Sequence, residues 1–353
     1  MLVTADAERR YIRAIFAALG ATDAEADAVA EVLVEADLRG HTSHGLVRVA
    51  LSVELVQAGV ARVGARPRLV RERAAAALMD GDGALGPYAA ILATREAMRR
   101  ARATGAAALG LRASGHIALA GYYAELAARE DLIGLVFAKS ETWIHPYGGV
   151  EPILGTNPIA IAIPTLGDPL LLDMATSATS RGKLVEAAAA GRELPLGWAI
   201  DASGAPTTDA RAAVEGGALS PVGGAKGHGL ALAVELLGGV LTGAGAGPMR
   251  DAAGWRNLWG TLFLVLDPAA FVDVGAFKAA VSDFLAQIKG SRLAPGFAEI
   301  LIPGERSYRE RQERLAHGIV VPDDAWEQVA AIARSLGLNA DEYCAPSPPL
   351  SGE

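Results

Sequence analysis

The segment Asp37-Leu-Arg-Gly-His-Thr-Ser-His-Gly-Leu-Val-Arg48 brings two arginines and two histidines together at the predicted end of a helix. Upstream, Thr22 and Glu25 have the spacing of a capping box. Apolar residues then recur at helical spacing, at Val29, Val32, Leu33 and Ala36. Gly40 ends the helix. Side chains that transfer protons and side chains that hold a carboxylate are thus gathered at one helix terminus, which indicates part of an active site.

The residues before this segment predict a helical hairpin. An earlier helix has an apolar face and ends at Gly20; the face consists of Ile12, Ile15, Phe16 and Leu19. The hairpin delivers His41, Ser43, His44 and Arg48 to a loop or to the start of the next helix. We expect this helical segment to span 1–72. A mixed α/β domain over 73–310, a C-terminal helical segment over 311–345 that packs on the N-terminal part, and a tail over 346–353 then follow.

Downstream, alanine-rich helical patterns alternate with short β-branched runs, which predicts an α/β protein with a mixed sheet. The expected strands are 74–79, 106–111, 132–138, 159–163, 170–173, 261–266 and 298–302. The expected helices are 88–103, 227–241 and 323–336.

Composition narrows the class of protein. The 353 residues are 51% hydrophobic, enough for a large core in one or two closely joined domains. A net charge of −8 without a basic cluster argues against a nucleic-acid partner. The apolar run 229–247 contains Glu235 and several glycines, so we expect a buried helix and no membrane span. The N-terminus lacks the pattern of a signal peptide, and the single Cys344 excludes an internal disulfide, so we expect a cytoplasmic protein.

Two glycine motifs differ in what they predict. Gly81-Asp-Gly83-Ala-Leu-Gly86 has the spacing of a dinucleotide fingerprint, but no acid follows about 20 residues later to bind a ribose. A tight strand-to-helix turn is the better interpretation. Gly223-Gly-Ala-Lys-Gly-His-Gly229 has no Ser or Thr after its lysine and is not a Walker loop. It still offers backbone N–H groups and Lys226 to a phosphate at the start of a helix.

A second histidine, His116, stands in Ser114-Gly-His116, where a predicted strand ends and a helix begins. Polar groups at strand ends are where open α/β folds place their chemistry.

Taken in order, these segments resemble one family over about residues 5–335. The matching motifs are Asp37-Leu-Arg-Gly with Ser43-His44-Gly45 and Arg48, Ser114-Gly-His116, Gly148-Gly149 through Leu154-Gly-Thr-Asn-Pro158, Leu172-Asp-Met-Ala-Thr-Ser177, Gly197-Trp198 with Asp201, Pro206-Thr-Thr-Asp209, Gly223-Gly-Ala-Lys-Gly227 and Pro303-Gly-Glu305. Their order is that of the type 2 malate/L-lactate dehydrogenase family, which also holds sulfolactate, ureidoglycolate and diketogulonate enzymes and piperideine-2-carboxylate reductases. The resemblance implies an NAD(P)-dependent oxidoreductase with a fold that is not Rossmann, and a homodimer with active sites near the subunit interface.

The resemblance also assigns roles. Arg48 is expected to clamp the substrate carboxylate. His44 and His116 are the proton-transfer candidates, with His116 preferred for alcohol oxidation and Ser43 beside them. Lys139 is expected to polarise the carbonyl or to shift the pKa of the histidine. The expected cofactor cradle for NAD or NADP consists of Ser140, Asp173, Met174, Ala175, Thr176, Ser177, Lys226, Gly227, Pro303, Gly304 and Glu305. No metal is expected.

We therefore expect hydride transfer between a nicotinamide and a small 2-hydroxy or 2-oxo acid. Many relatives have Thr-Asn-Ser-x-Pro where this chain has Ala138-Lys-Ser-Glu-Thr142, followed by Trp143 and His145, which puts simple malate or lactate activity in doubt. A reductase of cyclic imino acids is the alternative. A metal-dependent hydrolase using His41, His44 and His116 is a third class, disfavoured because no acid stands in a ligand-like pair with these histidines.

Overall fold

The computed structural model describes residues 1–248, 250–251, 254–255 and 259–343. The chain opens with the expected pair of helices, α1 (Ala5–Ala18) and α2 (Asp23–Leu38). Both halves of the capping box at Thr22 and Glu25 are present, so that prediction is confirmed. A 3₁₀ turn (Thr42–His44) and helix α3 (Arg48–Gln57) follow, and they place the histidine–arginine segment between two helices.

The main sheet has seven strands in the order β2-β3-β4-β15-β5-β8-β9. Their bounds are Arg68–Glu72, Ala76–Ala84, Ala106–Ser114, Trp259–Leu266, Ile133–Ala138, Ile159–Ile163 and Leu170–Met174. Only β3 and β4 pair in parallel, and every other neighbouring pair in this sheet is antiparallel. The predicted mixed α/β class is therefore confirmed.

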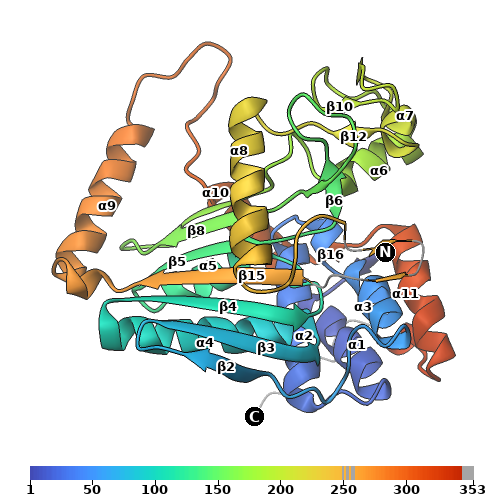
Figure 1. Cartoon of the computed structure of the whole chain (residues 1–353), viewed down its shortest axis with the longest axis horizontal. Helices are drawn as coiled ribbons and strands as arrows, with labels where there is room; N and C mark the ends of the chain where they lie inside the picture. The colour runs from blue at the N-terminus through green and yellow to red at the C-terminus, as the bar shows by residue number, and fades with distance from the viewer. Residues whose placement is uncertain (249, 252–253, 256–258, 344–353) are drawn as a thin grey trace.

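The two faces of the sheet are covered unequally (Figure 1). Helices α4 (Gly86–Thr104) and α5 (Ala120–Ala128) pack on one face, and α2 packs on α4 behind them. On the other face lies α8 (Ala225–Val234), which continues as a π-helical segment, Glu235–Val240, packed on β15, β5 and β4. The expected helix 227–241 is thus present, and its last part, Glu235–Val240, is a π-helix.

A smaller lobe with its own apolar core lies beside the main sheet. Its five short strands run in the order β11-β10-β12-β6-β7, with bounds Pro206–Thr207, Ala199–Ile200, Ala218–Leu219, Thr142–Ile144 and Leu154–Gly155. Helices α6 (Arg181–Ala189) and α7 (Ala210–Val214) complete the lobe.

The C-terminal part returns to the N-terminal helices. α10 (Glu305–His317) contacts α2, α11 (Asp323–Ser335) contacts α3, and β16 (Ile319–Val320) pairs with β1 (Leu2–Val3). The main core is continuous from α1 and α2 through the sheet to α11. Helix α9 (Val274–Lys289) stands at the side of the molecule (Figure 1) and has no buried side chain. The remaining described elements are two 3₁₀ segments, Pro268–Ala270 and Ala340–Tyr343, and a two-stranded sheet of β13 (Arg250–Asp251) and β14 (Gly254–Trp255).

The expected strand over 298–302 is wrong. The next residue, Pro303, accepts one hydrogen bond from Leu171 N at the edge of the sheet, and the chain then turns at Gly304 (φ +99°) just before α10 begins at Glu305. The turn at 81–86 is shorter than expected, since β3 runs to Ala84 through a register shift and α4 begins at Gly86.

The predicted segment boundaries stay a prediction, and Cys344 and the tail lie outside the described residues. Within residues 1–343, apart from the gaps named above, no helix is long and apolar enough to cross a membrane.

Candidate active site

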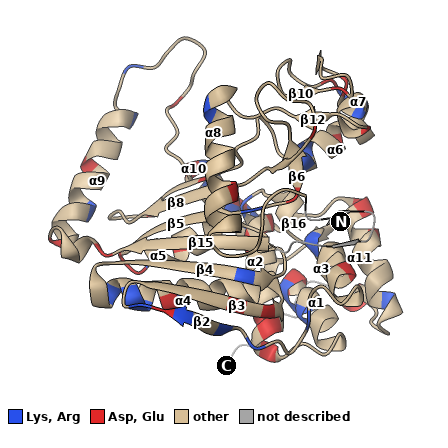
Figure 2. Cartoon of the chain, viewed as in Figure 1, with Lys and Arg blue, Asp and Glu red and all other residues tan. Residues whose placement is uncertain are grey.

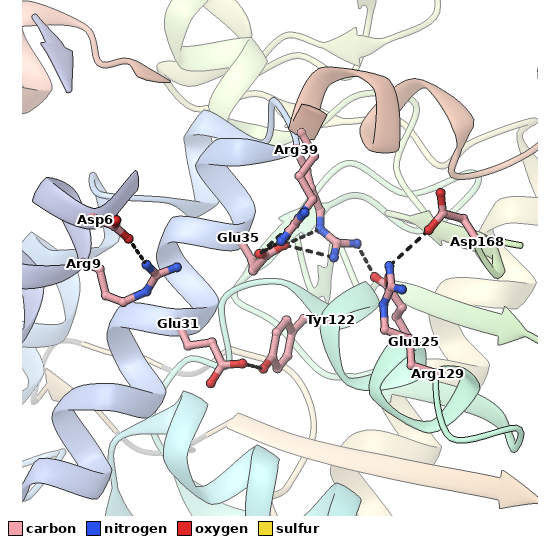
Figure 3. A network of polar contacts seen from close by, with 10 residues as sticks. Asp6, Arg9, Glu31, Glu35, Arg39, Tyr122, Glu125, Arg129 and Asp168 are labelled. Atoms are coloured by element: carbon pink, nitrogen blue, oxygen red, sulfur yellow. Dashed lines mark hydrogen bonds and ion pairs between the residues drawn. The ribbon is translucent and has the colours of Figure 1, made fainter. Parts of the chain in front are cut away.

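A buried ion network fixes the C-terminal end of α2, where the active-site loop (residues 40–48) begins (Figure 3). Arg39 donates to Glu35 through Nε at 3.1 Å and pairs with Glu125 of α5. Arg311 of α10 donates to the same Glu35 at 2.7 Å, and Arg129 donates to Glu125. Burial works against ionisation here, but the Arg311 and Arg39 guanidiniums still hold the pKa of Glu35 below its usual value. The network therefore joins three helices at the start of the loop.

Asp37 holds the loop from inside. Its carboxylate accepts a hydrogen bond from Leu46 N at 2.6 Å. A Cβ at Gly45 would lie 1.9 Å from the same carboxylate, so only glycine fits there. Burial and the neighbouring Asp37 raise the pKa of Glu8 well above its usual value, and burial raises that of Asp37 to about 6. The Leu46 bond and the close approach of Gly45 thus tie the loop to Asp37 near the end of α2.

The loop itself arranges three of the predicted site residues. Ser43 Oγ lies 2.8 Å from His44 Nδ1. Arg48 Nε donates to the carbonyl oxygen of Ser43 at 2.7 Å. That bond fixes the plane of the guanidinium, since Nε–H and the terminal NH₂ groups form one rigid fork.

His116 comes to this loop from the end of β4. The turn that carries it holds Ala113 and Ala118 at φ +50° and +60°, backbone strain of the kind that gathers at functional sites. The N–H of Ala118 donates to His116 Nδ1 at 3.1 Å. The ring lies edge-on to Trp259, and its centroid is 6.2 Å from that of His44. The structure thus brings His44 and His116 together.

The surroundings of both histidines favour the neutral form of the ring. Burial, then the charge of Arg48, lowers the pKa of His44 to about 3 and that of His116 well below its usual value. Because Ala118 N–H occupies Nδ1, the neutral His116 ring carries its proton on Nε2. Such an imidazole donates a hydrogen bond through Nε2 and resists becoming an imidazolium.

A cavity of about 760 Å³ opens beside the loop. Arg48, Glu141, Trp143 and Arg181 line it together with residues of α3 and α11, which include Glu54, Gln57, Gln328 and Ile332. The cavity therefore has the size of a small-molecule site, and it places Arg48 at its wall.

Lys139 lies at the end of β5 and is fully buried. A Cβ at Gly239 would lie 3.0 Å from its Cδ, so the side chain packs on the π-helical segment. Burial lowers the pKa of Lys139, and the nearby Glu235 opposes this. Its catalytic role stays a prediction.

The predicted cofactor residues fall into two groups. In the first, Ser140 N donates to Asn157 Oδ1, and Thr176 Oγ1 donates to the backbone oxygen of Asn157. Thr176 O in turn accepts from Val222 N, against which Gly227 packs at the start of α8. Ser140, Thr176, Ser177 and Gly227 thus lie around one hydrogen-bonded cluster, and Lys226, next to Gly227, is exposed.

The second group lies along β9. Asp173 accepts from Gly121 N at 2.7 Å at the start of α5, and burial raises its pKa to about 6. Met174 pairs with Ile159, and Ala175 follows it. Pro303 and Gly304 pack on Leu171 at the far end of the strand, while Glu305 is paired with Lys289.

Sequence reasoning gave no role to Asn157, whose side chain also donates to Ala231 O and to Glu235. The Thr-Asn-Pro motif was the signal available in the sequence. Asparagine tolerates a left-handed backbone better than most residues, and φ at Asn157 is +38°. The contribution of α11 to the cavity had no signal in the sequence. Among the described residues, no group of three or more His, Cys, Asp or Glu side chains is arranged to hold a metal.

Arg48 lines the cavity, and its charge acts on the neighbouring rings of His44 and His116, an arrangement that suits an enzyme for a small carboxylic acid. The chain belongs to the malate/L-lactate dehydrogenase family, whose model matches residues 3–330. This assignment supersedes the hydrolase alternative.

The relatives cover nearly the whole chain. The L-sulfolactate dehydrogenase of Methanothermobacter thermautotrophicus is 37% identical over 97% of this chain and 99% of its own length. A Delta(1)-pyrroline-2-carboxylate/Delta(1)-piperideine-2-carboxylate reductase of Pseudomonas syringae pv. tomato is 34% identical over 91% and 93%. The solved structure of sulfolactate dehydrogenase from Methanocaldococcus jannaschii is similar with a TM-score of 0.91 at 36% identity, covering 98% and 100% of the two chains.

Proposed function

We propose that this enzyme transfers a hydride between a nicotinamide cofactor and C2 of a small 2-hydroxy or 2-oxo acid. The observation that carries the proposal is the placement of Arg48 at the cavity beside the neutral pair His44 and His116. The Nε–H of Arg48 is used by Ser43, so the terminal NH₂ groups are the ones that bind the carboxylate. When bound, the nicotinamide supplies or accepts the hydride.

We propose that His116 meets the reacting oxygen through Nε2. In reduction, Nε2–H donates to the carbonyl oxygen and gives up its proton as negative charge develops there. Ala118 N–H then stabilises the charge left on Nδ1. His44 is the competing assignment. Ser43 Oγ can donate a hydrogen bond to His44 Nδ1 when that nitrogen carries no proton, or accept one when it does, so the ring is held in place in either state.

The residues present fit a dinucleotide. Gly227 is packed closely on Val222, since a Cβ at Gly227 would lie 2.0 Å from the carbonyl oxygen of Val222. The backbone N–H groups at the start of α8, together with Lys226, are the groups that suit a phosphate. From Leu171 to Thr176 the extended chain spans roughly 16 Å, enough to line a dinucleotide between the two groups of residues. We propose a dinucleotide-binding fold that is not Rossmann, which the mainly antiparallel sheet supports. The choice between NAD and NADP is left to experiment.

A reductase of cyclic imino acids is the second candidate. Glu54 and Glu141 line the cavity with Arg48, and a carboxylate near the reacting centre favours a cationic iminium.

We also propose that the enzyme is a homodimer. Leu264, Leu135, Ile161 and Leu172 form a row of half-buried side chains across four neighbouring strands. Figure 2 shows that this part of the sheet carries few charges. On α9 no side chain is buried, and Phe284 is 60% exposed. Apolar surface of this extent favours a second copy as its cover. Sedimentation of Ile161→Glu is expected to show monomers where the parent shows dimers.

We propose a cytoplasmic location, which a sequence with one cysteine suits. The test of the main proposal is a screen at 340 nm with NADH and NADPH against 2-oxo acids and cyclic imines. Oxidation of a reduced cofactor by a 2-oxo acid supports the leading function, and turnover confined to cyclic imines supports the second. No turnover with either class contradicts both.

A further inference from the structure

Lys139 is a buried cation that the proposed proton transfer does not use. Its side chain is 1% exposed, and its Nζ has no hydrogen-bond partner among the described residues. The charges that act on the rings of His44 and His116 are those of Arg48 and of a neighbouring histidine. The charge that acts on Lys139 is that of Glu235, which is also buried. Because a buried ammonium costs free energy unless an opposite charge compensates it, Lys139 and Glu235 form one pair of buried charges.

The π-helical segment that begins at Glu235 encloses this pair. A Cβ at Gly238 would lie 2.9 Å from Lys139 N, and a Cβ at Gly239 would lie 3.0 Å from Lys139 Cδ. The two glycines thus let the helix lie directly on the end of β5 and on the stem of Lys139. Short π-helical segments of this kind are frequent at functional sites.

Glu235 connects the pair to the predicted cofactor residues. Its Oε1 accepts from Gly247 N at 2.8 Å, and its Oε2 accepts from Asn157 Nδ2 at 2.7 Å. Asn157 Oδ1 accepts from Ser140 N at 3.0 Å, and Asn157 N donates to Ser140 Oγ at 3.0 Å. A buried carboxylate therefore holds Ser140 through Asn157.

This arrangement needs both oxygens of Glu235 as acceptors. An ionised carboxylate accepts at both, whereas a protonated one carries an O–H that would face one of the two donors, Gly247 N or Asn157 Nδ2. A positive charge nearby favours the ionised form. Loss of the Lys139 charge would therefore disturb Asn157 although Lys139 itself does not bond to it.

We propose that Lys139 is a positioning residue of the cofactor site. Its charge keeps Glu235 ionised, Glu235 orients Asn157, and Asn157 fixes the N–H and the hydroxyl of Ser140 for the dinucleotide. This role replaces the expected polarisation of the substrate carbonyl by Lys139. The inference rests on the proposed function, since Ser140 is a cofactor residue only if a nicotinamide dinucleotide binds here.

The test measures the binding of NADH and NADPH to the enzyme without substrate, by nicotinamide fluorescence, together with kcat and thermal unfolding. Lys139→Met removes the positive charge, and Glu235→Gln removes the negative one. Each variant is expected to raise the Kd of the better-bound cofactor roughly 10- to 100-fold, as for a lost charge-assisted hydrogen bond. At saturating cofactor, kcat should stay near the parental value.

The double variant Lys139→Met/Glu235→Gln separates a pair from two independent residues. Each single variant leaves one buried charge without its opposite, whereas the double variant leaves none. The double variant should therefore bind the cofactor no more weakly than either single variant. If Lys139→Met does not fold alone, the comparison of Glu235→Gln with the double variant is the same test, because Lys139→Met should cost little once residue 235 is neutral.

Lys278→Met is the matched control. This lysine of α9 pairs with Asp131 at the surface, so its loss should leave the Kd and kcat at their parental values.

Three results overturn the inference. Parental cofactor affinity with kcat lowered by ~10²-fold or more would make Lys139 a catalytic residue. Losses that add in the double variant would separate Lys139 from Glu235. An unchanged Kd with a lower unfolding temperature would make the pair merely structural. A parent enzyme that binds neither NADH nor NADPH needs no variant to be seen, and it contradicts the proposed function itself.

Discussion

Gly86→Ala tests whether the position of His116 depends on the start of α4. A Cβ at Gly86 would lie 2.1 Å from the carbonyl oxygen of His116 and 2.5 Å from that of Gly115. Both are backbone atoms, which cannot rotate away. Ordinary contact begins at 3.4 Å, so the His116 turn must move by 3.4 − 2.1 Å, or about 1.3 Å.

Overpacking of this kind costs about 1–3 kcal/mol of unfolding free energy. A displacement of about 1 Å at a catalytic group costs on the order of 10²-fold in rate. We therefore expect kcat/KM to fall about 100-fold, with a urea unfolding midpoint that is lower but still cooperative. Gly167→Ala is the control, because nothing lies within 4 Å of the added Cβ. It should change stability by less than about 1 kcal/mol and leave kcat/KM unchanged. A folded Gly86→Ala enzyme with parental kcat/KM would refute the reasoning.

Further predictions concern the other site residues. Arg48→Lys keeps the charge but loses the fork, so substrate binding should weaken by about 1.5–3 kcal/mol in titrations while cofactor binding stays the same; equal losses would place the carboxylate elsewhere. His116→Ala should lower kcat by ~10²–10⁴, more than His44→Ala, in steady-state assays; the reverse order would give the proton to His44. Because burial and Arg48 lower both histidine pKa values, both rings stay neutral from pH 6 to 8, and kcat/KM for oxo acid reduction should vary less than about twofold. An imidazolium donor with an ordinary pKa of about 6.5 would instead lose roughly 20-fold over this range.

Local sequence signals predicted most helices and strands, because helical spacing and β-branched runs need no distant partner. The capping box at Thr22 and Glu25 is an example. The order of the sheet had no such signal: β15 is far along the chain but lies between β4 and β5. The failure at 298–302 has the same origin, since a short apolar run becomes a strand only if a neighbouring edge pairs with it.

At the site, residue types identified Arg48, His44 and His116, and the fold brings the three together. What the sequence lacked was the direction of each polar atom. The bond from Ala118 N to His116 Nδ1 depends on a positive φ, and the burial of Lys139 depends on Gly239. The contact of Lys139 with Gly239 joins segments that are distant in the sequence, whereas the bond to His116 is local but needs a backbone conformation that alanine rarely adopts.

The transfer of deuterium tests the central claim most directly. The enzyme is given a 2-oxo acid and NADH or NADPH labelled with deuterium at C4 of the nicotinamide, and the product is analysed by mass spectrometry. Hydride transfer predicts one deuterium on C2 of the hydroxy acid, with none lost to solvent. A product formed without deuterium from cofactor labelled on both faces of C4 would contradict direct hydride transfer at this site.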